Sequence, residues 1–144
     1  MSVFCTLHIR SNSHAALPPE FLRSSEKMNL EFVDNNSPDV RERRERVRKK
    51  LGLEEISLPR FHWHLSSDGF VDSDMIYDHI AWIFGLIRPG RPLFQQLGQE
   101  FEYWISVFWQ GNGTGGGPLI TLEIAELLLF HKVEMGVGFY LDQT

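Results

Sequence analysis

The chain has 144 residues, of which 42% are hydrophobic and 23% charged, a composition typical of one compact soluble domain rather than a disordered or collagen-like chain. A chain of this length can bury a sufficient core without disulfides, and its single cysteine, Cys5, favours a reducing compartment. No run approaches the roughly 20 apolar residues of a membrane helix, and the first residues lack the basic start of a signal peptide. We therefore expect a single cytoplasmic domain over residues 1–144.

The net charge of −5 is unevenly distributed along the chain. Residues 41–50 hold seven of the 14 basic residues and two acidic ones, a net of +5, which leaves −10 on the remainder. Such an acidic body repels nucleic acid and membrane surfaces and attracts basic partners, and complementary charge can raise association rates by about 10 to 10³. The charge distribution therefore indicates a cationic protein as the partner.

The N-terminal part of the chain predicts two strands joined by a loop and a short helix. Apolar residues at alternate positions indicate a strand over residues 3–9, followed by a loop over 11–16. The prolines at 18 and 19 begin a short helix that fades by residue 29. Residues 30–33 are a possible second strand, before a turn cluster.

The basic run lies in a helix that we expect from Pro38 to Leu51. Serine suits the N-cap, proline is favoured at the first helical position, and Gly52 ends the helix. One interpretation is an arginine-rich arm that binds phosphates. The other, which we favour because no stacking aromatics or base-reading groups lie nearby, is a solvent-facing helix docked on the core by one narrow apolar stripe. That stripe consists of Val40, Val47 and Leu51.

The rest of the chain alternates between strands and helices. Period-2 alternation predicts strands over residues 60–66, 101–109 and 133–141. Helical spacing predicts a main core helix over about 74–86 behind an Asp72-Ser73 cap, one further turn over 92–97, and a last helix over 121–130. Because the strands alternate instead of being continuously apolar, one face of the sheet is solvated or only partly covered. We expect an α+β fold with helices packed on one face of a mostly antiparallel sheet.

A glycine-rich segment matches a nucleotide-binding pattern, since Gly111, Gly113 and Gly116 fit G-x-G-x-x-G between a strand and a helix. A dinucleotide fingerprint needs its third glycine inside the helix, whereas Gly117 and Pro118 interrupt the backbone before the helix begins. No Lys-Ser/Thr pair follows for a P-loop. A connecting loop is the favoured interpretation, with phosphate binding as the alternative.

Two histidines have the spacing of metal ligands. His62 and His64 share one face of their predicted strand, and Asp78-His79 on the following helix could complete the set. However, His79 falls on the inward side of that helix, where a core-edge histidine with one hydrogen bond is the more economical account. We favour two exposed sheet-face histidines, and we expect neither a metal nor a cofactor.

Nothing in the sequence predicts covalent catalysis. Cys5 lies within a predicted buried strand, and no serine has a G-x-S-x-G elbow around it. The acidic residues between positions 68 and 78 follow a turn and a helix start, where negative charge is electrostatically favoured. We therefore expect a binding protein without catalytic residues. The predicted partner-binding residues are Asp68, Asp72, Asp74, Asp78, Trp82, Glu102, Trp104 and Trp109.

Short motifs in the second half of the chain occur in a fixed order. They are Trp63-His64-Leu65-Ser66-Ser67, His79-Ile80-Ala81-Trp82-Ile83, Leu86-Ile87-Arg88-Pro89 and Gly-Gly-Pro-Leu-Ile-Thr-Leu-Glu before the last helix. This order resembles a widespread family of small bacterial proteins of unassigned function, over residues 61–140. The resemblance implies a cytosolic α+β domain, and some members are encoded beside toxins, as immunity proteins would be. The first sixty residues depart from the family pattern, because an early aspartate-rich turn is missing and the basic helix is atypical.

Charge, motifs and resemblance together favour an immunity protein that occludes a basic, nuclease-type toxin. Aromatic anchors inside a rim of charge are features of tight, electrostatically steered complexes. The alternative hypothesis is a small-ligand or nucleic-acid binding module that uses the glycine-rich loop and the arginine-rich helix.

Overall fold

The computed structural model describes residues 2–22, 29–54, 58–88, 90–111 and 117–141. Its strands are β1 (Ser2–Ser11), β2 (Leu30–Asp34), β3 (Phe61–Ser66), β4 (Glu102–Gly111) and β5 (Glu134–Leu141). Its helices are α1 (Pro38–Leu51), α2 (Ile76–Leu86), α3 (Leu93–Gln96) and α4 (Leu122–His131). None of the helices in this described part of the chain has both the length and the apolarity that crossing a membrane requires.

The strands form one five-stranded sheet in the order β2-β3-β1-β4-β5. Neighbouring strands are antiparallel except for β4 and β5, which are parallel. That parallel pair follows from the connection through α4, since parallel strands need a crossover and an antiparallel pair can be joined by a tight turn. β1 is the central strand and is therefore paired along both edges.

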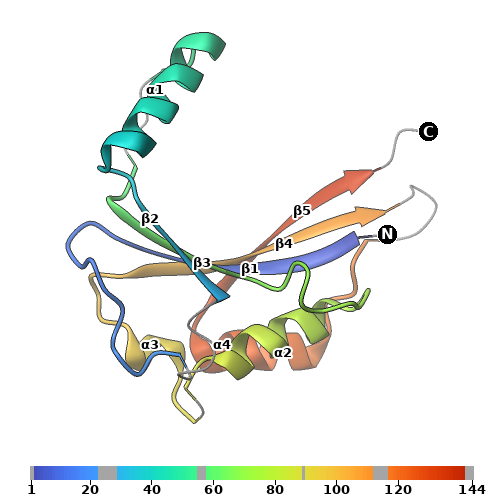
Figure 1. Ribbon diagram of the computed structural model, residues 1–144. Coiled ribbons are helices and arrows are strands. Elements are labelled where there is room, and N and C mark those ends of the chain that lie inside the picture. The colour runs from blue at the N-terminus through green and yellow to red at the C-terminus, as the bar shows by residue number, and fades with distance from the viewer. Residues whose placement is uncertain (1, 23–28, 55–57, 89, 112–116, 142–144) are drawn as a thin grey trace.

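The helices α2, α3 and α4 pack beneath one face of the sheet, and in the described part of the chain no helix packs on the opposite face, from whose β2 end α1 projects (Figure 1). The α+β fold with helices on one face of a mostly antiparallel sheet is thus confirmed. Alternate residues of the strands point into the helix-covered core, where α2 supplies Ile80 and Ile83 and α4 supplies Ile124. The remaining residues of each strand form the helix-free face.

Two helix ends match the capping signals in the sequence. Gly52 adopts a left-handed φ of 64° after α1, and its N–H bonds carbonyls of the last turn, as expected for a glycine that ends a helix. The Thr121 hydroxyl accepts a hydrogen bond from the N–H of Ile124 at the start of α4.

The predicted docking of the basic helix on the core is wrong. α1 has no buried residue and rises away from the sheet (Figure 1). Val40 and Val47 instead line an open groove of about 540 Å³ between α1, β2 and the segment around Leu58. Leu51, the third residue of the predicted stripe, does not line the groove and is exposed. The spacing of apolar residues along a helix does not determine how far the helix lies from the sheet.

Two further local predictions also differ from the structure. Residues 19–22 form a turn and then a bridge from Leu22 to Ile87, and the rest of the helix expected there lies outside the described residues. α2 begins at Ile76 and not at residue 74. The Ser73 hydroxyl accepts the N–H of Met75, and Met75 is extended, so it lies outside the helix.

One buried histidine makes stability depend on pH. Burial lowers the pKa of His131 from 6.5 to about 4. Its Nδ1 accepts the N–H of Leu93 at 2.9 Å, and its ring stacks on Phe84 at 4.0 Å. A proton on Nδ1 would break that hydrogen bond, so the native state favours the neutral ring.

We expect the free energy of unfolding to be fully retained above pH 6.5 and to fall as the pH drops from 6.5 to 4. In that window the unfolded chain binds a proton at His131 that the native chain does not. Replacing His131 by Asn should lower the slope of unfolding free energy against pH by up to about 1.4 kcal/mol per pH unit. Urea unfolding at several pH values measures the slope, and equal slopes in the two proteins would contradict this role.

Candidate functional site

The segment between β3 and α2 presents acidic and aromatic side chains together. Phe70 is 59% exposed and stacks on Trp82 of α2, with ring centroids 5.2 Å apart and an interplanar angle of 17°. Four exposed carboxylates belong to the same short stretch of chain. We call this set the acidic patch: Asp68, Phe70, Asp72, Asp74, Asp78 and Trp82.

Buried hydrogen bonds hold this segment in place. The His79 Nε2–H donates to the carbonyl of Ser73 at 2.7 Å, which leaves Nδ1 as an acceptor for the Ser67 hydroxyl, also at 2.7 Å. Both side chains are fully buried, so His79 is a core histidine with two hydrogen bonds and not the core-edge residue with one that the sequence predicts. The carbonyl of Ser67 in turn accepts the N–H groups of Phe70 and Val71. The patch is therefore supported by rigid structure.

The negative charge of the patch is not neutralised by nearby cations. Among the described residues, none of the four aspartates takes part in an ion pair. Asp78 accepts a hydrogen bond from the Ser73 hydroxyl, which fixes the orientation of its carboxylate without adding positive charge. Four exposed, unpaired carboxylates within so short a stretch of chain create a negative potential that attracts a basic surface.

The eight predicted partner-binding residues do not form one surface. Five of them gather in the acidic patch. Glu102 and Trp104 lie on the helix-free face instead, where Glu102 pairs with Arg10 at 2.6 Å and the same guanidinium lies over the Trp104 ring. Trp109 is only 7% exposed, because it occupies the inward-facing register of β4, so its ring is not presented to a partner on the surface.

The helix-free face brings three histidines together. His8 of β1 lies directly opposite His64 of β3 in the strand register, and His62 lies two residues from His64 on the same face. One ring nitrogen from each histidine falls within 4.8 Å of the others, so the three side chains could approach one metal ion. The predicted pairing of His62 and His64 is present, but the third member is His8, while His79 is buried in the core beside Ser67.

The sequence prediction of a metal-ligand set did not include His8, although the strand pattern places this residue on the outward face. Alternation over the first strand places His8 outward, between the inward Leu7 and Ile9. Its proximity to β3 depends on β1 being the central strand, a long-range pairing that the spacing of residues along the chain does not reveal.

The two features behind the alternative hypothesis are only partly described. Most basic residues of α1 are exposed, and its Arg48 pairs with Glu45 within the helix. The glycine-rich segment from 112 to 116 lies outside the described residues.

Comparison of the chain with protein-family models, with curated proteins and with solved structures gave no match.

Proposed function

We propose that this chain is an inhibitor of the immunity type, which binds a basic, nuclease-type toxin through the acidic patch and blocks it by occlusion. The observation that carries the proposal is the exposed Phe70 ring stacked on Trp82 within a group of unpaired carboxylates. The motif order over residues 61–140, which resembles a family of unassigned function with some members encoded beside toxins, favours the same class of partner.

The composition of the patch suits protein recognition. Energetically dominant residues in interfaces are commonly aromatic and central, whereas surrounding charges steer association and select the partner. Stacking on Trp82 holds the Phe70 ring before a partner arrives, which reduces the side-chain entropy lost on binding. Binding through such a patch requires no reactive group.

The proposal is tested by mixing the purified chain with a basic toxin domain encoded beside it, in low salt. We expect a one-to-one complex at micromolar concentration or below, and inhibition of the toxin in the same range. Phe70→Ala should weaken binding about 30-fold or more, the typical cost of losing an interface hot spot of 2 kcal/mol. Asp72→Asn with Asp74→Asn should mainly slow association and reduce its dependence on salt.

Phe139→Ala is the matched control, because Phe139 on β5 is 58% exposed but lies outside the patch. Its complex should keep the affinity of the unmodified chain. Absence of a complex at micromolar concentration, or equal losses in the two phenylalanine variants, would contradict the proposal. Retention of the chain on immobilised heparin that is lost on replacing Arg43 and Arg46 by Glu would favour the nucleic-acid alternative instead.

A further inference from the structure

Three imidazoles meet on the helix-free face of the sheet, on two adjacent central strands. His8 is contributed by β1, and His62 and His64 by β3. Backbone pairing on both edges of β1 fixes these strands, so the positions of the side chains do not depend on a loop. We propose that His8, His62 and His64 form a binding site for a divalent transition-metal ion, with zinc as the ion that suits the ligands best.

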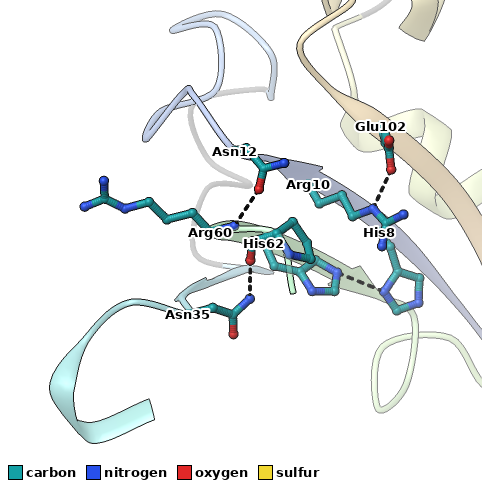
Figure 2. Close-up of polar contacts among 8 residues, drawn as sticks. His8, Arg10, Asn12, Asn35, Arg60, His62 and Glu102 are labelled. Atoms are coloured by element: carbon teal, nitrogen blue, oxygen red, sulfur yellow. Dashed lines mark hydrogen bonds and ion pairs between the residues drawn. The ribbon is translucent and has the colours of Figure 1, made fainter. Parts of the chain in front are cut away.

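The spacing of the rings agrees with tetrahedral coordination. The Nδ1 of His8 and the Nε2 of His62 are 3.4 Å apart and face each other (Figure 2). Two nitrogens at the usual zinc distance of about 2.0–2.1 Å, in tetrahedral positions, are about 3.3–3.4 Å apart. The His62 and His64 rings are stacked with centroids 3.9 Å apart, and one nitrogen from each of the three rings lies within 4.8 Å of the others. A rotation of the His64 side chain toward the other two nitrogens would complete the ligand set.

Neighbouring groups fix which nitrogen of His8 is available. The Nε2 of His8 is hydrogen-bonded to the Ser106 hydroxyl of β4 at 2.8 Å, so Nδ1 is the nitrogen turned toward His62. The ring also stacks on Trp104, with centroids 4.8 Å apart and an interplanar angle of 10°. Hydrogen bonds to the second nitrogen commonly orient metal-binding histidines. Ser106 is therefore a positioning residue for the site.

The site provides unprotonated ligands at neutral pH. Partial burial and the nearby His64 ring lower the pKa of His8 to about 4. Partial burial, the His64 and His8 rings and the Arg10 guanidinium lower the pKa of His62 to about 4. Burial also lowers the pKa of His64, against the opposing effect of the Glu31 carboxylate across the strand pair. At neutral pH the rings are therefore in the neutral form in which imidazole binds a metal ion, and a bound ion would replace the hydrogen bond between His8 Nδ1 and His62 Nε2.

The ligand chemistry identifies the class of ion. Imidazole nitrogens suit zinc, copper and nickel, whereas calcium and magnesium prefer oxygen. Three protein ligands on a face without a covering helix leave a fourth position open to water, to an anion or to a side chain of a partner (Figure 1). The site lies apart from the acidic patch, so it does not depend on the proposed function.

Calorimetric titration of the tag-free chain with Zn²⁺, after removal of metals with a chelator, tests the proposal. We expect one ion per chain with a Kd of about 1 μM or tighter. His62→Gln and His64→Gln should each weaken zinc binding at least 100-fold. Ser106→Ala should weaken it about 10-fold or more, as for other groups that orient a ligand.

His14→Gln is the matched control, because His14 is an exposed histidine outside the cluster that lies near Glu100. It should bind zinc as the unmodified chain does. Circular dichroism of the metal-free variants verifies folding, and the unmodified chain with Co²⁺ gives a second measurement that needs no substitution. An intense visible spectrum typical of tetrahedral Co²⁺ supports the site.

Three results would each overturn the proposal. They are a zinc Kd weaker than about 1 mM, zinc affinity unchanged in both His62→Gln and His64→Gln, and a weak octahedral cobalt spectrum. None of these results bears on toxin binding, which involves a different part of the surface.

Discussion

Replacing Ile80 by alanine should lower the free energy of unfolding by about 2–5 kcal/mol, the usual cost of truncating a large residue in a packed core. Ile80 is fully buried on the face of α2 that packs against the sheet. The substitution removes three buried carbons and leaves a cavity between the helix and the sheet. Chemical denaturation monitored by tryptophan fluorescence measures the loss.

Leu122→Ala provides the matched comparison, because Leu122 is in the first turn of α4 and is 80% exposed. Its unfolding free energy should change by less than about 0.5 kcal/mol, as for other surface substitutions. Similar losses in the two variants would show that α2 is not packed on the sheet as described.

Local patterns in the sequence were sufficient to predict most of the fold. Alternation in β1, β3 and β4 gave both the strands and their inward faces, because one face is buried against helices and the other is not. Capping signals placed both ends of α1 correctly, since a proline and a glycine act within their own turn of helix. These properties depend on neighbours a few residues away.

Arrangements that depend on residues far apart in the chain were not predictable in the same way. The meeting of His8 with His62 and His64 requires the pairing of β1 with β3, and the exposure of α1 requires its position relative to the sheet. The burial of Trp109 is different, since the alternation of β4 already placed it inward with Val107. Aromatic character alone therefore does not predict an anchor residue unless the side chain also lies on the outward face of its strand.

The two proposed sites use the two sides of the sheet differently. Loop 67–75 leaves β3 toward the helix-covered side and carries the acidic patch, while the histidines project from the helix-free face. On both sides the functional side chains are held by buried or partly buried hydrogen bonds, from Ser67 and His79 in one case and from Ser106 in the other. Ser67 and Ser106 each hold a histidine that positions one of the two sites, so replacing either serine should alter the neighbouring site.

Ser67→Ala should destabilise the fold and loosen the acidic patch at the same time. The Ser67 hydroxyl accepts the N–H of Cys5 at 2.9 Å and donates to Nδ1 of His79, and all three residues are fully buried. Alanine leaves both partners unpaired away from water, at roughly 1–3 kcal/mol each, so we expect a loss of about 2–6 kcal/mol of unfolding free energy.

The loss should be accompanied by a local change that a general destabilisation does not produce. The amides of Phe70 and Val71 bond the carbonyl of residue 67, so they should exchange hydrogen faster in Ser67→Ala than the amides of α4 do. Ser13→Ala, at an exposed serine whose hydroxyl makes only a long 3.5 Å contact with Ser11, should change stability by less than about 0.5 kcal/mol and leave exchange at Phe70 and Val71 unaltered. If Ser67→Ala accelerates exchange uniformly over the whole chain, the hydrogen bonds of Ser67 stabilise the fold without specifically holding the patch, and Phe70 must owe its position to the stacking on Trp82 alone.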